Sequence, residues 1–253
     1  MILNPCLTLS SILRDSTIKK QFNSKKNSVY WINTERERFT GTGKQFVLKE
    51  YNHSQQSLER EADMLQKLKI RHVAVPHLFY AGHESIVIEY IEGPLLLDFI
   101  CWQENVNGSN SSELAGPVYQ AIYSLCRWFK EFYSAARDVS GKQLIMGDVH
   151  FRNFIIREKI YGVDFEECRE GRIEEDIGRL CAFALTYTPA FTSWKIAMTG
   201  ELFRILNLEL DLEKEVTKRE MQKELLAIAK RRTSSYEMVE LLLVNLFEKD
   251  MAL

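Results

Sequence analysis

The sequence predicts an α+β fold with a β-rich amino-terminal part and a helical carboxy-terminal part. Up to about residue 91 the chain contains short runs of β-branched and aromatic residues, which are typical of strands. After a polar segment at 103–113, rich in Asn and Ser, apolar residues recur at intervals of three and four, as in amphipathic helices. A chain of 253 residues can form one compact unit or two closely packed lobes.

The amino-terminal part is expected to contain strands around one helix. Runs rich in β-branched and aromatic residues predict strands at 28–33, 44–51, 78–82 and 85–91. A Thr-Gly-Thr-Gly-Lys turn signal between the first two predicts a hairpin. Apolar residues three or four apart within 53–70 predict a helix, with Ser54 or Ser57 as its cap. A strand before residue 23 would complete the order strand, strand, strand, helix, strand, strand.

The carboxy-terminal part is expected to be helical with a short β insertion. One face of a long helix is predicted by the spacing of Leu114, Val118, Ile122, Leu125, Phe129 and Phe132. Two short strands are expected at 154–156 and 160–165, joined by a polar turn. From Asp176 onward the pattern is again helical, including the apolar run at 236–247.

Composition excludes several classes of protein. With 33 basic and 35 acidic residues, no bulk charge indicates nucleic acid or a membrane as a partner. The five cysteines form no CxxC pair and are odd in number, which argues against a disulfide framework or a zinc site. The amino terminus lacks the pattern of a signal peptide, and charged residues interrupt the most apolar stretch, 85–102. We therefore expect a soluble, cytoplasmic protein.

A lysine on a predicted internal strand indicates a charged site. Lys49 lies between apolar neighbours, where an unpaired ammonium group would cost considerable free energy. Glu61 is the natural partner, because the predicted helix can turn it toward the sheet while burying Leu65 one turn later. Lys49 alone could equally be an edge-strand lysine with a solvated head, so its interpretation depends on the motif that follows downstream.

The segment MGDVHFRNFII carries the strongest chemical signal. Asp148 and Asn153 are five residues apart on a loop that a predicted apolar strand follows at once. Asp164 ends the second short strand, so a hairpin would bring it toward Asn153. Carboxylate and amide oxygens are the hard ligands that Mg²⁺ prefers, which leaves Asp148 as a candidate base. Phosphoryl transfer needs these groups together with a cation on the nucleotide phosphates.

In this order the motifs resemble the protein-kinase-like superfamily, and in detail its aminoglycoside phosphotransferase and choline kinase branch, over about residues 20 to 190. The resemblance implies a two-lobed kinase fold with lobes at 1–91 and 92–253, and ATP and Mg²⁺ as cofactors. It implies these roles: phosphate binding by Lys49 with Glu61 as its partner, adenine binding by the backbone of Glu89, Tyr90 and Ile91, catalysis by Asp148, metal binding by Asn153 and Asp164, and support of the loop by Asp176.

Departures from the common protein-kinase pattern favour the small-molecule branch. No G-x-G-x-x-G motif precedes the second strand, and the corresponding loop at 22–32 carries Ser24, similar to the serine-bearing nucleotide loop of small-molecule kinases. His150 stands where ordinary protein kinases have lysine. Asp-Phe-Glu replaces Asp-Phe-Gly, and only twelve residues separate Asp164 from Asp176, which leaves little room for an activation loop. Met146 stands where the family usually has histidine.

The sequence therefore predicts an ATP-dependent phosphotransferase that moves the γ-phosphoryl group to a hydroxyl of a small molecule. A run of glutamates after Asp164 would suit a cationic acceptor or form a solvated loop: Glu166, Glu167, Glu170, Glu174 and Glu175. An atypical serine/threonine protein kinase with a protein substrate is the alternative, and a non-catalytic nucleotide-binding module is a second. Neither nucleic acid nor a membrane is expected as a partner.

Overall fold

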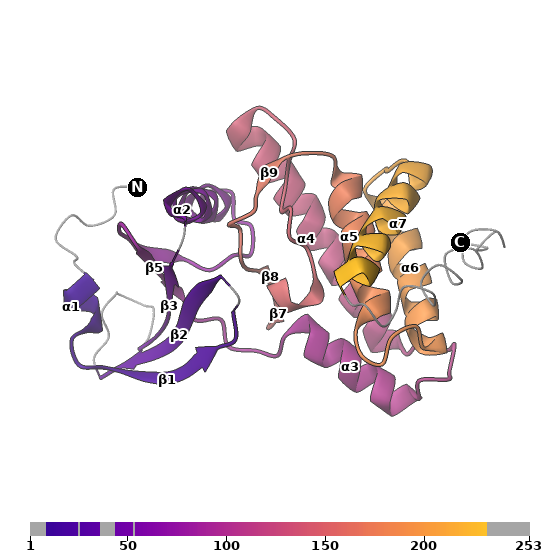
Figure 1. Cartoon of the computed structure of the whole chain (residues 1–253), viewed down its shortest axis with the longest axis horizontal. Helices are drawn as coiled ribbons and strands as arrows, with labels where there is room; N and C mark the ends of the chain where they lie inside the picture. The colour runs from indigo at the N-terminus through magenta and orange to yellow at the C-terminus, as the bar shows by residue number, and fades with distance from the viewer. Residues whose placement is uncertain (1–8, 25, 36–43, 53, 232–253) are drawn as a thin grey trace. The chain divides into compact units, whose positions relative to one another are not determined.

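A computed structural model describes residues 9–24, 26–35, 44–52 and 54–231 (Figure 1). The chain divides into two compact units. The first contains the chain up to Glu92 together with Tyr161–Cys168, and the second contains Gly93–Ile160 and the chain from Arg169 onward. A five-stranded antiparallel sheet lies in the amino-terminal part and helices dominate the carboxy-terminal part, which confirms the predicted α+β class of a two-lobed kinase-like fold.

The first unit is built on a sheet with strand order β1-β2-β3-β5-β4. Its strands are β1 (Ser16–Phe22), β2 (Asn27–Thr34), β3 (Gln45–Tyr51), β4 (Leu78–Ala81) and β5 (Ser85–Glu89). All neighbours pair antiparallel, and β3 lies between β2 and β5. The predicted strand order and the internal position of Lys49 are therefore confirmed, whereas the turn signal between β2 and β3 lies mostly outside the described residues.

The two faces of this sheet have different tasks. Successive strand residues point to opposite faces. One face forms a core with Ile12 of α1 (Leu9–Leu13), and its members are Ile32, Phe46, Leu48, Phe79 and Val87. By the strand register, Lys49 lies opposite Val29 on β2 and Ile86 on β5, on the other face. The face with Lys49 is thus separate from the apolar core.

Helix α2 (Gln55–Ile70) follows β3 as predicted. The Ser54 side chain accepts a hydrogen bond of 3.1 Å from the Ser57 backbone N–H, so Ser54 is the cap. The apolar stripe of the helix is buried, and so is Glu61, which is 1% exposed. Glu61 is one turn before Leu65, so burying the stripe also directs this carboxylate inward.

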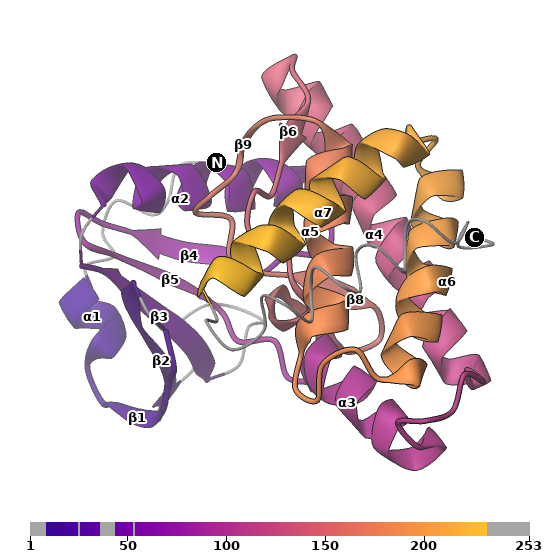
Figure 2. The ribbon, with the colours of Figure 1, turned by 45° about the vertical axis from the view of Figure 1, so that its right-hand side comes forward.

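Helices make up most of the second unit. They are α3 (Leu96–Asn107), α4 (Gly116–Ser140), α5 (Ile173–Thr186), α6 (Ser193–Glu209) and α7 (Lys214–Arg231). The predicted stripe of the long helix is buried on α4 from Val118 to Phe132, whereas Leu114 precedes the helix. Short strands β6 (Leu144–Ile145) and β9 (Arg169–Glu170) pair with each other. Figure 2 shows α7 running obliquely across α5.

The loop between β6 and α5 carries the motif residues. A 3₁₀ turn, Phe151–Asn153, leads into β7 (Phe154–Ile156), and β8 (Ile160–Gly162) spans the point where the chain passes into the first unit. Both strands were predicted, but β8 ends at Gly162 instead of residue 165. Asp164 has φ of +67°, a left-handed conformation that an extended strand cannot contain.

The prediction of a surface loop over 103–113 was wrong in its first half. Helix α3 continues to Asn107 and ends at Gly108, whose φ is +85°. Glu104 is buried on this helix because Lys195 of α6 forms an ion pair with it and Thr192 donates a hydrogen bond to it. Polar composition indicates exposure only where the polar groups lack partners elsewhere in the fold.

Two further predictions are reported for the described residues alone. Within them, no helix combines the length and the apolar character that a membrane crossing requires. The four cysteines that they include, Cys101, Cys126, Cys168 and Cys181, are not joined by disulfides. The helix predicted at 236–247 lies outside the described residues.

Candidate active site

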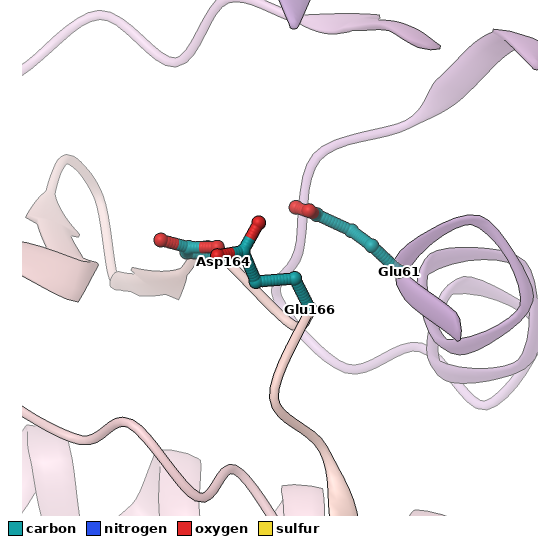
Figure 3. Close-up of side chains that lie close together, drawn as sticks. All are labelled: Glu61, Asp164 and Glu166. Carbon is teal, nitrogen blue, oxygen red and sulfur yellow. The ribbon is translucent and has the colours of Figure 1, made fainter. Parts of the chain in front are cut away.

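In the first unit, Lys49 of β3 is surrounded by three carboxylates. Its Nζ donates hydrogen bonds to Oε2 of Glu61 at 2.6 Å and to Oδ1 of Asp164 at 2.8 Å. Oε2 of Glu166 forms an ion pair with the same nitrogen at 3.1 Å. Figure 3 shows Glu61 reaching from α2 toward Asp164 and Glu166. The structure therefore brings together Lys49, Glu61 and Asp164, three residues that the sequence analysis selected.

Burial and charge act in opposite directions on Lys49. The residue is 6% exposed, and burial alone would lower the pKa of its ammonium group. The negative charges of Glu61, Asp164 and Glu166 outweigh this effect and raise the pKa of Lys49 well above its usual value. Tyr51 donates its hydroxyl proton to Glu61, and burial together with Glu61 raises the pKa of Tyr51. Lys49 is consequently a permanent cation and Tyr51 a permanent donor.

Glu166 was not selected from the sequence as a member of this cluster. Its carboxylate accepts a hydrogen bond of 2.5 Å from Nδ2 of Asn27, the first residue of β2. Its backbone oxygen accepts one of 2.6 Å from Nη1 of Arg60 on α2. These contacts hold the segment after Asp164 against both the β1–β2 loop and α2. A glutamate in place of the glycine of Asp-Phe-Gly was the sequence signal that could have indicated it.

The acidic run was assigned to a cationic-substrate pocket or to a solvated loop, and neither description fits all five residues. Glu166 and Glu174 are buried. Glu174 pairs with Arg172, and Glu175 pairs with Arg169 at 2.7 Å. Only Glu170, next to Lys142, is an exposed ion pair of the ordinary surface kind. The structure therefore assigns most of this run to local ion pairing.

The carboxylates in the first unit have the donor chemistry of a magnesium site. Oxygen atoms of Glu61, Asp164 and Glu166 lie within 4.8 Å of one another. Glu61 is engaged with both Lys49 and Tyr51, and its side chain is 2% exposed. The Asp164 side chain is 39% exposed, so it presents oxygen outward from the cluster. Hard carboxylate oxygens of this kind fit Mg²⁺, and Asp164 is the member best placed to hold it.

The residues selected for nucleotide binding lie at the edge of the same unit. The Ser24 hydroxyl accepts a hydrogen bond of 3.3 Å from the Asn27 backbone N–H, which shapes the β1–β2 loop. Glu89 ends β5, and its carboxylate accepts hydrogen bonds from Lys69 and from the His77 backbone. Tyr90 stacks on Trp31 of β2, with ring centroids 4.6 Å apart and planes inclined by 3°. Ile91 is buried directly after them.

In the second unit, Asp176 of α5 anchors the loop that contains Asp148. Its carboxylate accepts hydrogen bonds from the backbone N–H of Met146 at 2.8 Å, the backbone N–H of Gly147 at 3.0 Å and the Tyr133 hydroxyl at 3.0 Å. Burial raises the pKa of Asp176 to about 6, although these hydrogen bonds act in the opposite direction. Met146 is itself fully buried, so its apolar side chain packs beneath the loop in place of a histidine.

Asp148 and Asn153 are close to each other on this loop. Nδ2 of Asn153 donates a hydrogen bond of 2.8 Å to the backbone oxygen of Asp148. The Asp148 side chain is 39% exposed, with Oδ2 4.0 Å from Nε2 of His150. Oδ1 of Asp148 lies 3.2 Å from Nη1 of Arg179, a residue that the sequence analysis did not select. The loop thus presents one carboxylate to solvent while its backbone is fixed from below.

Comparison with known proteins gives one partial similarity. No protein-family model matches the chain. The chain is 29% identical over 118 residues to the EKC/KEOPS complex subunit BUD32 of Encephalitozoon cuniculi, which covers 47% of this chain and 50% of that protein. The chain therefore spans about half the length of the curated relative it matches.

This similarity supports the protein-kinase-like superfamily and a kinase-like phosphotransferase at that level. It gives no support to the aminoglycoside phosphotransferase and choline kinase branch. Of the predicted functions, the atypical protein kinase fits the similarity better than the small-molecule kinase does.

Proposed function

We propose that the protein is an ATP-dependent, Mg²⁺-requiring phosphotransferase of the atypical protein kinase type, with a hydroxyl of a protein as acceptor. The observation that supports this proposal most directly is the cluster of Lys49, Glu61 and Asp164. It provides a permanent cation, an internal partner that fixes the cation in place, and an outward carboxylate for metal. The similarity to BUD32 favours a protein over a small molecule as acceptor.

Each group has a role in this proposal. Lys49 binds nucleotide phosphates, Ser24 belongs to the loop that covers them, and the backbone of Glu89–Ile91 binds the base. Asp164 and Asn153 hold Mg²⁺, which when bound neutralises charge on the phosphate oxygens. Asp148 orients the acceptor hydroxyl and takes its proton as the new P–O bond forms and the bond to the leaving ADP oxygen breaks.

A small-molecule acceptor remains the second candidate, and one feature of the chain favours it. Only twelve residues separate Asp164 from Asp176, and they include β9 and the first turn of α5. A segment this short leaves little length for an activation loop or a peptide-docking platform. Acceptors of both kinds therefore belong in the test of function.

The decisive experiment measures Mg²⁺-dependent ATP consumption and acceptor phosphorylation by the wild type and by Asp148→Asn. The acceptors are basic proteins, amino sugars, aminoglycosides and choline-like alcohols. We expect stimulation by a protein acceptor and a loss of about 100-fold or more in Asp148→Asn. Asp63→Asn, which removes an exposed carboxylate paired with Lys67 on α2, is the matched control and should retain activity.

Other outcomes have definite meanings. Asp148-dependent stimulation by a small molecule alone would replace the protein acceptor with the second candidate. Because BUD32 is by name a subunit of a complex, we also propose that this chain works with protein partners, and proteins that co-purify with it belong in the assay. Nucleotide binding without Asp148-dependent turnover under any of these conditions would reject the enzyme and leave the non-catalytic nucleotide-binding module.

A further inference from the structure

Arg179 of α5 connects the loop that contains Asp148 to helix α7. Its Nη1 donates a hydrogen bond to the backbone oxygen of Gly147 and another, of 3.2 Å, to Oδ1 of Asp148. Its Nε and Nη2 lie 3.3 and 3.1 Å from Oε2 of Glu224 on α7. The other oxygen of Glu224 accepts a hydrogen bond of 2.7 Å from Arg231. One guanidinium group thus binds the loop and α7 at the same time.

Burial distinguishes this arrangement from surface ion pairs. The side chain of Glu224 is 11% exposed and that of Arg179 is 29% exposed. The planar guanidinium holds several acceptors in fixed directions, which a lysine ammonium cannot do. Water screens charges at such sites less than at the surface, so a change in one partner affects the others more strongly. The pair therefore has the properties needed to fix a geometry.

The packing of α7 on α5 limits how far Glu224 can move. Gly178, the neighbour of Arg179, lies so close to α7 that a Cβ there would be 2.6 Å from the Met221 backbone nitrogen and 2.8 Å from Cβ of Glu220. Figure 2 shows α7 crossing α5 in this way. Because the helix backbones are in contact at the crossing, the position of Glu224 relative to Arg179 follows from the fold itself.

We infer that Arg179 is a positioning residue for Asp148 and that α7 holds Arg179 in place through Glu224. Arg179 binds Oδ1, so it determines that Oδ2 is the oxygen presented to the acceptor hydroxyl. Asp176 fixes the loop backbone, whereas Arg179 fixes the carboxylate. Helix α7 then belongs to the catalytic apparatus of the second unit. This inference rests on the proposed function of Asp148.

The test compares Arg179→Ala, Arg179→Lys and Glu224→Gln in the full chain, using the acceptor that stimulates the wild type. For Arg179→Ala we expect kcat to fall about 10- to 100-fold, the effect of a misplaced catalytic group, with KM for ATP within about twofold. Arg179→Lys restores part of kcat because the charge returns without the planar fork. Glu224→Gln lowers kcat by less than Arg179→Ala does.

Two measurements separate positioning from a general structural role. A polar cavity of about 200 Å³ is lined in part by Gly147, Arg179 and Glu224, so guanidinium ion at non-denaturing concentration should recover part of the kcat of Arg179→Ala. Residues that act as a unit are not additive. Adding Arg179→Ala to Asp148→Asn should therefore lower the remaining turnover by less than about twofold. Arg204→Ala, which breaks the pair with Glu201 on α6, is the matched control.

The results that overturn the inference are distinct from those that overturn the proposed function. If Asp148→Asn abolishes wild-type turnover while Arg179→Ala leaves kcat unchanged, only the positioning role is wrong. A loss of kcat in Arg179→Ala that neither lysine nor guanidinium restores, and that is fully additive with Asp148→Asn, would also reject it in favour of a structural role. If the wild type has no Asp148-dependent turnover, both proposals fail together.

Discussion

The charged groups of the two units are arranged in opposite ways. Around Lys49, one ammonium faces the carboxylates of Glu61, Asp164 and Glu166, so negative charge is in excess. Around Asp148 and Asp176, each carboxylate faces donors from Arg179 or from the loop backbone. The first cluster depends on its single cation and suits the binding of a further metal ion. The second is a loop whose acceptors are already matched, as preorganised catalysis requires.

The largest effect is expected when the first cluster loses its cation. Lys49→Ala leaves Glu61 buried without its ion-pair partner, and removing one partner of a buried pair costs about 3–5 kcal/mol. Urea unfolding of the full chain measures this change in the free energy of unfolding. Lys67→Ala, which breaks an exposed pair with Asp63 on α2, is the matched control and should change stability by less than about 1 kcal/mol.

The comparison would fail if Lys49→Ala cost no more than the control. That result would mean that the three carboxylates tolerate one another without the ammonium, through bound protons or water. The excess of negative charge would then be of no consequence for stability.

In the second unit, the free-energy cost of a buried carboxylate is expected to appear as a pH dependence. Burial raises the pKa of Asp176 from 3.8 to about 6, so between these values the folded chain binds more protons than the unfolded chain. The stability contribution of Asp176 therefore falls as pH rises from about 4 to about 6. Asp176→Asn cannot titrate, so the stability of wild type minus variant should fall by on the order of 3 kcal/mol across this range.

Unfolding free energies of both proteins at pH 4, 5, 6 and 7 measure this difference directly. Hydrogen bonds that the variant loses at all pH values only shift the whole curve. A difference that rises with pH would show that the donors around Asp176 lower its pKa more than burial raises it. The second unit would then hold its carboxylate even more firmly than the comparison assumes.

Local sequence was sufficient for the parts of the site whose geometry is local. Lys49 follows from an apolar strand, and Glu61 from the phase of the helix that comes directly after it. Asp148 and Asn153 are five residues apart on one loop, and a hydrogen bond joins them. In each case the periodicity of a single element, or a short loop, determines which side chains meet.

Sequence failed where ionic partners lie far apart along the chain. Asn27 binds Glu166 across 139 residues, and Arg179 binds Glu224 across 45. Glu104 is buried because its partner, Lys195, is 91 residues away on α6. A charged residue suggests a solvated surface unless its partner is known, and with 68 charged side chains the pairing depends on the tertiary fold. The role of Arg179 could therefore not be read from the sequence alone.

The smallest effect is expected for Glu166→Gln, and its sign sharpens the description of the first cluster. Glu166 contacts both Lys49 and Asn27, the groups that in the proposed function face nucleotide phosphates. Removing its charge leaves fewer anions to compete for Lys49, so affinity for Mg²⁺-free ADP should rise about three- to tenfold, or about 0.6–1.4 kcal/mol. Glu167→Gln, which changes a more exposed neighbour paired with Lys26, is the matched control.

Calorimetric titration with ADP, with and without Mg²⁺, separates the two ways in which Glu166 could act. Higher affinity in both conditions means that Glu166 competes with phosphate for Lys49. Lower affinity that appears only with Mg²⁺ means instead that Glu166 is a metal ligand beside Asp164, because a carboxamide is a weaker ligand for a hard cation than a carboxylate. In the second case the negative excess around Lys49 exists to bind metal, and the contrast with the donor-matched loop of the second unit becomes one of metal binding against acceptor binding.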